Sequence, residues 1–215
     1  DLHSFPTRRS SDLHIDEFAH AWNGSARRPR GAGDFDTAID GRLLWVSEGL
    51  TQYFGEVLAA RAGAVTPDQF RQRLAAMQGR MEATAGRAWR PLQDTATAVQ
   101  LMFAAPREWS SARRSDDFYF EGANLWLEID CLIRKGTRGR GSLDDFVRGF
   151  FSRTVDETYD YDDVVAALGR VYEFDWDTFL RRRLTSTAAA DFARGVEEAD
   201  RKSTRLNSSH PYRSR

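Results

Sequence analysis

The stretch GRLLWVSEGLTQYFGEVLAARAG, Gly41–Gly63, carries the dominant pattern of this 215-residue chain. Its apolar side chains recur at close to 3.6-residue spacing, at Leu44, Trp45, Leu50, Tyr53, Phe54, Val57 and Leu58. That spacing places them on one face of a helix. Gly63 follows at a position where glycine commonly ends a helix. The stretch therefore predicts a helix that buries one face.

The same period recurs elsewhere, and no segment shows the alternation typical of a strand. We expect further helices within the ranges 14–22, 66–86, 94–106, 115–137, 142–153, 159–172 and 175–184. Thr66 and Ser142 are the expected N-caps of two of them. The sequence therefore predicts a mostly α fold, an irregular helical bundle. Tryptophans on the predicted helices should build its core, namely Trp22, Trp45 and Trp126.

Three local patterns add smaller expectations. The segment 23–40, rich in Gly, Arg, Asp and Pro, is predicted to be a loop, with Arg27, Arg28 and Arg30 as loop charges or as the lining of a cleft. The acidic segment DETYDYDD, 156–163, is predicted to be a helix start and solvated surface. The helix predicted within 66–86 should bury a stripe formed by Phe70, Leu74, Met77 and Met81.

The stretch HIDEFAHAWNG, His14–Gly24, nearly contains the pattern His-Glu-x-x-His. In that pattern two histidines one helical turn apart bind zinc, and the glutamate acts as a general base. Glu17 and His20 are in place, but Asp16 stands at the first histidine position. Taken alone the match is weak, because a Glu and a His three residues apart occur by chance in many helices.

A second block, with Glu48 some 28 residues beyond His20, gives the match more weight. EFAHAWNGSARRP and LLWVSEGLTQYFGEVLAARAG together resemble the catalytic core of the PDZ-containing glycyl aminopeptidases, a family of gluzincin zinc metallopeptidases. Its usual pattern is His-Glu-Phe-x-His-x-Trp-Asn, an Arg/Pro loop, then Trp-x-x-Glu-Gly-x-Thr-x-Tyr. The matching residues are Glu17, Phe18, His20, Trp22, Asn23, Trp45, Glu48, Gly49, Thr51 and Tyr53.

A third block, DFYFEGANLWLEID, resembles the Tyr-x-x-Gly block of zinc aminopeptidases at Tyr119 and Gly122. The resemblance spans nearly all of 14–187 and implies the helical part of a thermolysin-like zincin catalytic domain. It implies Zn²⁺ held by His20, Glu48 and the residue at position 16. It also implies Glu17 as catalytic base and Tyr119 as hydrogen-bond donor to the scissile carbonyl. The alternative for Tyr119 is a core aromatic beside two phenylalanines.

Asp16 is the departure from the family pattern. Aspartate can ligate zinc, but its side chain is shorter than that of histidine and adds a negative charge. We therefore expect weaker zinc binding and an impaired or inactive enzyme. Position 16 also lies beside an N-terminal segment, 1–13, that resembles translated sequencing-adapter DNA, as does the segment 200–215. We favour a sequence error at this junction over an evolved inactive enzyme. Finding aspartate in clean reads of the parent gene would contradict that interpretation.

These segments define the expected organisation. Residues 14–187 form a partial catalytic domain, 188–199 a linker, and 1–13 and 200–215 artefactual or disordered tails. The family implies an upstream β-rich region, whose sheet lines the substrate cleft, and a downstream PDZ domain. Neither fits in this chain, so we expect exposed apolar surface where the sheet would pack. We also expect this truncation to impair the activity, in addition to the effect of Asp16.

Charge and composition limit the partners. The two tails hold seven of the 31 Lys and Arg residues and three of the 32 Asp and Glu residues, which leaves 24 positive and 29 negative charges. This acidic balance does not favour nucleic acid. No apolar run has the ~20 residues of a membrane span. A peptide is the expected partner, and the bacterial cytoplasm and periplasm both remain open. The alternative function is a non-catalytic helical domain that binds peptides or other partners.

Overall fold

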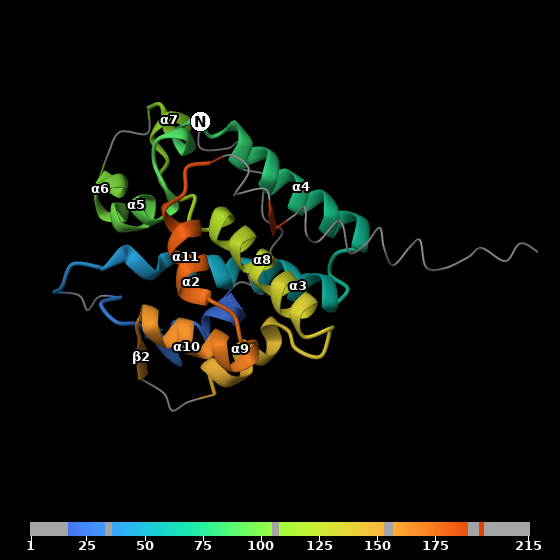
Figure 1. Cartoon of the computed structure of the whole chain (residues 1–215). Helices are drawn as coiled ribbons and strands as arrows, with labels where there is room; N and C mark the ends of the chain where they lie inside the picture. The colour runs from blue at the N-terminus through green and yellow to red at the C-terminus, as the bar shows by residue number, and fades with distance from the viewer. Residues whose placement is uncertain (1–16, 33–35, 105–107, 153–156, 189–193, 196–215) are drawn as a thin grey trace, which may run out of the picture.

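The computed structural model describes residues 17–32, 36–104, 108–152, 157–188 and 194–195. This part is mostly helical and forms an irregular bundle, which confirms the predicted fold class (Figure 1). Its elements are β1 (Arg27–Pro29), η1 (Gly41–Leu43), α2 (Leu44–Ser47), α3 (Gly49–Arg61), α4 (Pro67–Ala83), η2 (Ala85–Ala88), α5 (Leu92–Thr97), α6 (Val99–Ala104), α7 (Ser110–Arg113), α8 (Phe120–Gly136), α9 (Leu143–Phe150), β2 (Glu157–Tyr159), α10 (Tyr161–Val171) and α11 (Trp176–Thr185).

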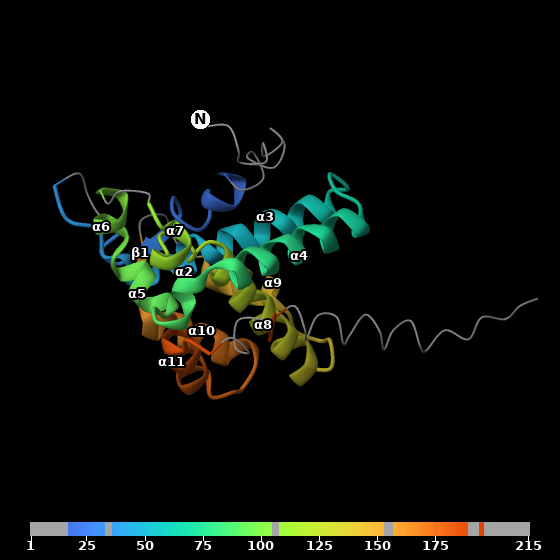
Figure 2. The same cartoon turned by 90° about the horizontal axis from the view of Figure 1, so that it is seen from above.

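Among the described elements, the helices α3 and α8 make the most extensive contact, and they cross at two glycines. A Cβ atom built on Gly49 would lie 2.7 Å from the Cα atom of Gly122, and one on Gly122 would lie 2.8 Å from the Cα atom of Gly49. Such distances leave no room for any side chain, so only glycine permits this approach. Figures 1 and 2 show α3 running beside α8, and α4 contacts both of these helices.

A series of aromatic rings joins these helices to the C-terminal elements. Trp45 and Trp126 are fully buried and stacked, with ring centroids 5.5 Å apart. The series continues through Phe146 and Phe150 to the buried ring of Tyr159, with centroid distances of 5.4, 4.9 and 5.1 Å. Aromatic pairs at these distances stabilise a core beyond their buried area. The core therefore extends continuously from α2 to β2.

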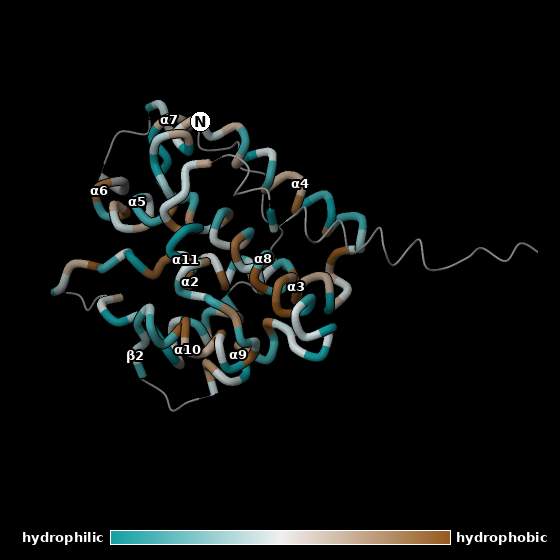
Figure 3. Tube along the Cα trace, in the orientation of Figure 1, coloured by the Kyte–Doolittle hydropathy of each residue, from teal (hydrophilic) through white to brown (hydrophobic). Residues whose placement is uncertain are grey.

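The helix α4 begins as predicted but buries less than predicted. Thr66 caps it in a full capping box with Gln69. Of the expected stripe, only Met81 is buried, whereas Phe70, Leu74 and Met77 are half-buried. Figure 3 shows α4 as largely hydrophilic, while hydrophobic positions gather where α3 and α8 meet. The helix therefore lies along the side of the bundle and not within it.

Two short strands correct the expectation of a loop between residues 23 and 40. β1 pairs with β2 in a parallel two-stranded sheet, with Arg27 opposite Glu157 and Pro29 opposite Tyr159. Each strand has three residues, which is too short for an alternating pattern to be read from sequence. The pairing brings the motif region against a segment about 130 residues later in the chain.

Two tryptophans of the predicted core are buried, but Trp22 is not. Trp22 is 38% exposed, and its ring packs at 4.8 Å against Phe18, which is 57% exposed. Trp22 lies in a turn after the helical residues 17–20, so it is outside the stripe that helical spacing would place inward.

Within the described ranges, none of the helices combines the length and apolar character needed to cross a bilayer.

Candidate functional site

His20 and Glu48 come together in the structure although 28 residues separate them. His20 ends the helical turn formed by residues 17–20, and Glu48 lies between α2 and α3. The Nε2 atom of His20 lies 3.5 Å from the Oε2 atom of Glu48. Both side chains are partly exposed, so a ligand can reach them from solvent.

The other nitrogen of the His20 ring determines what Nε2 can do. Nδ1 lies 3.2 Å from the backbone carbonyl oxygen of Asn23. Because a carbonyl can only accept, Nδ1 carries the proton of this hydrogen bond. In the neutral ring Nε2 then keeps its lone pair, on the side of Glu48. Metal-binding histidines are commonly held in this way by a second hydrogen bond.

The separation of 3.5 Å can be compared with a direct hydrogen bond and with two ligands of one cation. A charge-assisted hydrogen bond from an imidazolium to a carboxylate is usually about 2.7–2.9 Å long. Two ligand atoms about 2.1 Å from one tetrahedral ion lie roughly 3.4 Å apart. The observed separation agrees with the second arrangement. His20 and Glu48 therefore fit as two of the ligands of a small metal ion.

A protein site for such an ion usually supplies a third ligand. Among the residues that the structure describes, no group of three or more His, Cys, Asp or Glu side chains could hold a metal. Asp16, the expected third ligand, lies outside the described residues. Glu17 is exposed and shares the helical turn of His20, and its role as a base stays a prediction.

Asn23 links the segment that carries His20 to the segment that carries Glu48. Its buried side-chain amide donates to the carbonyl oxygens of Val46 and Ser47, at 2.8 and 3.0 Å, and lies 3.3 Å from the hydroxyl of Thr51. Val46 and Ser47 directly precede Glu48 in the chain. The side chain of Asn23 therefore fixes the backbone just after His20 to the backbone just before Glu48.

Tyr159 completes the surroundings of Asn23 from the C-terminal part of the fold. Its hydroxyl donates to Oδ1 of Asn23 at 3.0 Å. Burial raises the pKa of Tyr159 well above the usual value, and it outweighs the charge of Arg27, which lowers the pKa, while the charge of Glu48 adds to the increase. The phenol therefore keeps its proton and stays a donor. Tyr159 is fully buried, which corrects the expectation of solvated surface at this position in the acidic segment 156–163. The helix start expected in that segment is confirmed, because Asp160 caps α10.

Arg27 supports the ring of Tyr159 and is not a loop charge as predicted. It is 6% exposed, and its guanidinium lies over the ring of Phe150, 4.2 Å from the centroid, and 5.6 Å from that of Tyr159. Its Nη1 atom donates to the carbonyl oxygen of Phe150 at 3.1 Å, and its Nη2 atom lies 3.8 Å from Asp163. The arginine thus packs β1 against α9 and the start of α10.

Tyr119 lies near the crossing of α3 and α8. It is the N-cap residue of α8, three residues before Gly122, whereas Glu48 directly precedes Gly49. A Cβ atom built on Gly49 would also lie 3.1 Å from the carbonyl oxygen of Phe118, the residue before Tyr119. The glycine crossing therefore brings the start of α8 to Glu48. Tyr119 is half-buried beside Phe118, and the role of its hydroxyl stays a prediction.

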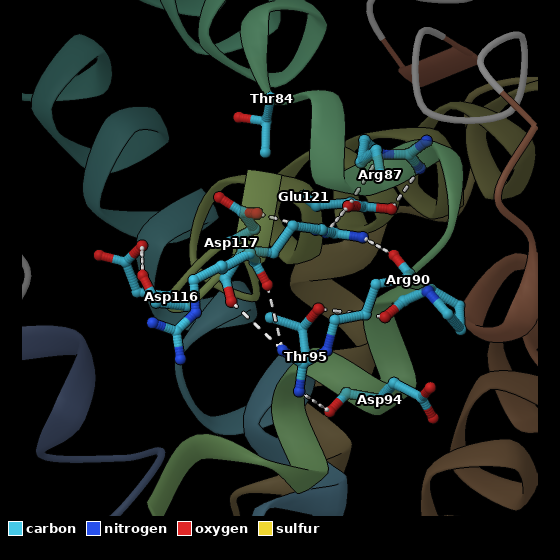
Figure 4. A network of polar contacts seen from close by, with 12 residues as sticks. Thr84, Arg87, Arg90, Asp94, Thr95, Asp116, Asp117 and Glu121 are labelled. Atoms are coloured by element: carbon cyan, nitrogen blue, oxygen red, sulfur yellow. Dashed lines mark hydrogen bonds and ion pairs between the residues drawn. The ribbon is translucent and has the colours of Figure 1, made fainter. Parts of the chain in front are cut away.

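A buried ion cluster anchors this end of α8 (Figure 4). Glu121 accepts hydrogen bonds from Arg87, one of them 3.0 Å long, and from Arg114, which also binds Asp117 at 2.8 Å. All four side chains are at most 6% exposed. Burial raises the pKa of Asp117, and the hydrogen bond from Arg114 opposes that shift. The cluster therefore holds Arg87 of η2 and Arg114, which directly follows α7, against the first turn of α8.

Sequence reasoning found His20, Glu48 and the region of Tyr119, but it gave no role to Asn23, Tyr159 or Glu121. Asn23 is one of the residues that match the family pattern, but the sequence does not show which residues it binds. Tyr159 and Glu121 act through partners 136 and 34 residues away. Contacts between residues so far apart leave no periodic signal in a single sequence.

Comparison with known proteins identifies a family and supports the fold. A family model described as M61 glycyl aminopeptidase matches residues 9–125. The crystal structure of an aminopeptidase N family protein from Idiomarina loihiensis superposes with a TM-score of 0.73 at 18% identity, over 87% of this chain and 33% of that one. At that identity the likeness shows the fold alone, and this chain spans about a third of the other protein's length. Comparison with curated proteins finds no match.

The helical fold and the family match together define a peptidase-type domain. More specifically, the chain belongs to the M61 glycyl aminopeptidase family, whose model covers more than half of it.

Proposed function

We propose that this chain is part of a zinc-dependent aminopeptidase that hydrolyses N-terminal peptide bonds. The observation that carries the proposal is the 3.5 Å approach of His20 Nε2 to Glu48 Oε2, with the Nδ1 proton of His20 held by the carbonyl of Asn23. Membership of the M61 family supports it independently. The aminopeptidase activity of the whole protein is part of what we propose. We also propose that the whole protein has an upstream sheet and a downstream PDZ domain, joined to this domain by the linker at 188–199.

Each residue has a distinct task in the proposed reaction. His20, Glu48 and the residue at position 16 hold the metal, which when bound supplies Lewis acidity for the scissile carbonyl and for water. Glu17 takes the proton from the attacking water and passes it to the leaving amine. Tyr119 donates a hydrogen bond to the carbonyl oxygen as negative charge develops there. The peptide bond breaks as the amine leaves with that proton.

Asp16 should weaken this site in the chain as it stands. With Asp16 as the third ligand, the two carboxylates give the three ligands a total charge of −2. With a second histidine in its place, Glu48 alone gives −1. The added charge lowers the Lewis acidity of the ion, and the shorter side chain reaches less far from the helix. We therefore expect weak zinc binding and little or no peptidase activity from this chain.

The second candidate function is a helical domain that binds peptides without cleaving them. The observation that favours it is the exposed aromatic pair Phe18–Trp22 beside the incomplete motif. Exposed aromatic rings of this kind can pack against the side chains of a bound peptide. In this alternative the scaffold is retained and the chemistry is lost.

The Asp16→His variant of the full chain separates the two candidates. We expect it to bind one zinc ion per folded chain, and to hydrolyse an aminoacyl reporter peptide once the upstream sheet implied by the family is restored. Adding Glu17→Gln should abolish the activity and leave zinc bound, because it removes only the base. A folded Asp16→His variant that binds no zinc would contradict the peptidase proposal and favour the binding domain. Activity of the unaltered chain that is lost on Glu17→Gln would contradict the impaired state proposed for Asp16.

A further inference from the structure

We propose that Asn23 and Tyr159 are positioning residues that hold His20 opposite Glu48. This inference rests on the proposed function, because it concerns the readiness of the same site for a metal. It goes further by assigning a role in the site to Tyr159, which lies beyond the residues matched by the family model.

The need for such residues follows from the segment that carries His20. Among the described residues, His20 is the last helical residue of this segment, and the residues directly after it form a turn. The end of a helix frays readily, so it is a weak anchor for the His20 side chain. The His20 side chain is also 29% exposed, so packing alone does not fix its direction. Its orientation must come from hydrogen bonds to the rest of the fold.

Asn23 supplies that connection with its backbone and its side chain at once. Its carbonyl oxygen accepts from Nδ1 of His20, and its amide group donates to Val46 and Ser47, immediately before Glu48. Asn23 alone therefore connects His20 by hydrogen bonds to the backbone next to Glu48. Asn23 is only 3% exposed, so water does not compete for these hydrogen bonds.

Tyr159 determines which way the amide of Asn23 points. Its hydroxyl donates to Oδ1 at 3.0 Å, which leaves the Nδ2 group to face the carbonyl oxygens before Glu48. Aspartate could not replace Asn23 here, because a carboxylate cannot donate to those carbonyls. Tyr159 is itself held by the pairing of β2 with β1 and by the ring of Phe150. The C-terminal part of the fold thus sets the geometry of the N-terminal motif.

The test measures zinc affinity by chelator competition in the full-length Asp16→His chain. We compare Asn23→Ala and Tyr159→Phe with a control, Tyr53→Phe. Tyr53 is also a buried phenol, but its hydroxyl donates to Asp130 of α8. Loss of one such hydrogen bond should destabilise either phenylalanine variant similarly, by a comparable shift in the denaturation midpoint. We expect 10–100-fold weaker zinc binding for Asn23→Ala and about tenfold for Tyr159→Phe, with no change for Tyr53→Phe.

Two outcomes would overturn the proposal. One is zinc binding by folded Tyr159→Phe as tight as in the Asp16→His chain. The other is an equal loss of affinity in Tyr53→Phe, which would make the effect one of general stability. If Asn23→Ala does not fold, Tyr159→Phe alone decides, because it keeps the ring and removes only the hydroxyl.

A measurement without metal keeps this inference separate from the proposed function. Nitrogen NMR of the imidazole reports which ring nitrogen of His20 carries the proton. We expect Nδ1–H in the unaltered chain and a mixture of both tautomers in Tyr159→Phe. If the Asp16→His chain binds no zinc, the proposed function fails, and the positioning role is then decided by the tautomer. An unchanged tautomer in Tyr159→Phe would overturn it.

Discussion

Replacing Glu121 by alanine should lower the free energy of unfolding by about 3–5 kcal/mol, because removing one member of a buried ion group leaves the others uncompensated. Glu121 accepts from both Arg87 and Arg114. Without it, Arg114 keeps the carboxylate of Asp117, whereas Arg87 loses the buried carboxylate that it binds. A loss of this size is a large part of the stability of an ordinary domain. Urea denaturation followed by circular dichroism measures it.

The matched control is Asp177→Ala, which breaks an ion pair at the surface. Asp177 and Arg181 lie on one face of α11 with 2.8 Å between the paired atoms, and both are well exposed to solvent. Exposed pairs contribute little, so the denaturation midpoint should barely change. If Glu121→Ala moves the midpoint no more than Asp177→Ala does, the buried cluster does not hold the start of α8.

Replacing Gly122 by alanine should destabilise the chain and disturb the site together. The new Cβ atom would meet the Cα atom of Gly49 at 2.8 Å, and a backbone atom cannot move aside as a flexible side chain would. The helices α3 and α8 must then separate, at a cost of about 1–3 kcal/mol or more. Their separation also moves Glu48 relative to Tyr119, so zinc binding by the Asp16→His chain should weaken as well.

Gly79→Ala is the control for that substitution. Gly79 lies inside α4, and a Cβ atom built on it meets nothing within 4 Å. Alanine is the better helix former by roughly 0.5–1 kcal/mol, so this variant should be slightly more stable than the parent. Thermal unfolding of both variants should give opposite shifts. Equal shifts in one direction would show that the glycine crossing does not limit the approach of α3 and α8.

The sequence predicted the helices well where local signals define them. Thr66 caps α4 and Ser142 caps α9, each in a capping box with the third residue of its helix. These signals act within one turn, so a single sequence contains all of them. The stacking of Trp45 on Trp126 also agrees with the predicted core. Helical periodicity was enough to place both rings on inward faces.

The sequence could not predict features that depend on distant partners. The buried positions of Arg27 and Tyr159 follow from the pairing of β1 with β2, in which each strand has only three residues. Trp22 is exposed because the helical turn ends before it. At the site, the approach of His20 to Glu48 was expected from resemblance, and their tie through Asn23 was not. These hydrogen bonds form only when the segments that carry Asn23, Glu48 and Tyr159 come together in the fold.

The most direct test of the account is the identity of the groups that bind zinc. We would load the Asp16→His chain with one equivalent of Zn²⁺ and compare it with versions that also carry His20→Ala or Glu48→Ala. The account predicts one tightly bound ion, loss of that ion in both further variants, and unchanged folding by circular dichroism. Tight, stoichiometric zinc binding that survives Glu48→Ala would contradict the central claim that His20 and Glu48 share one metal.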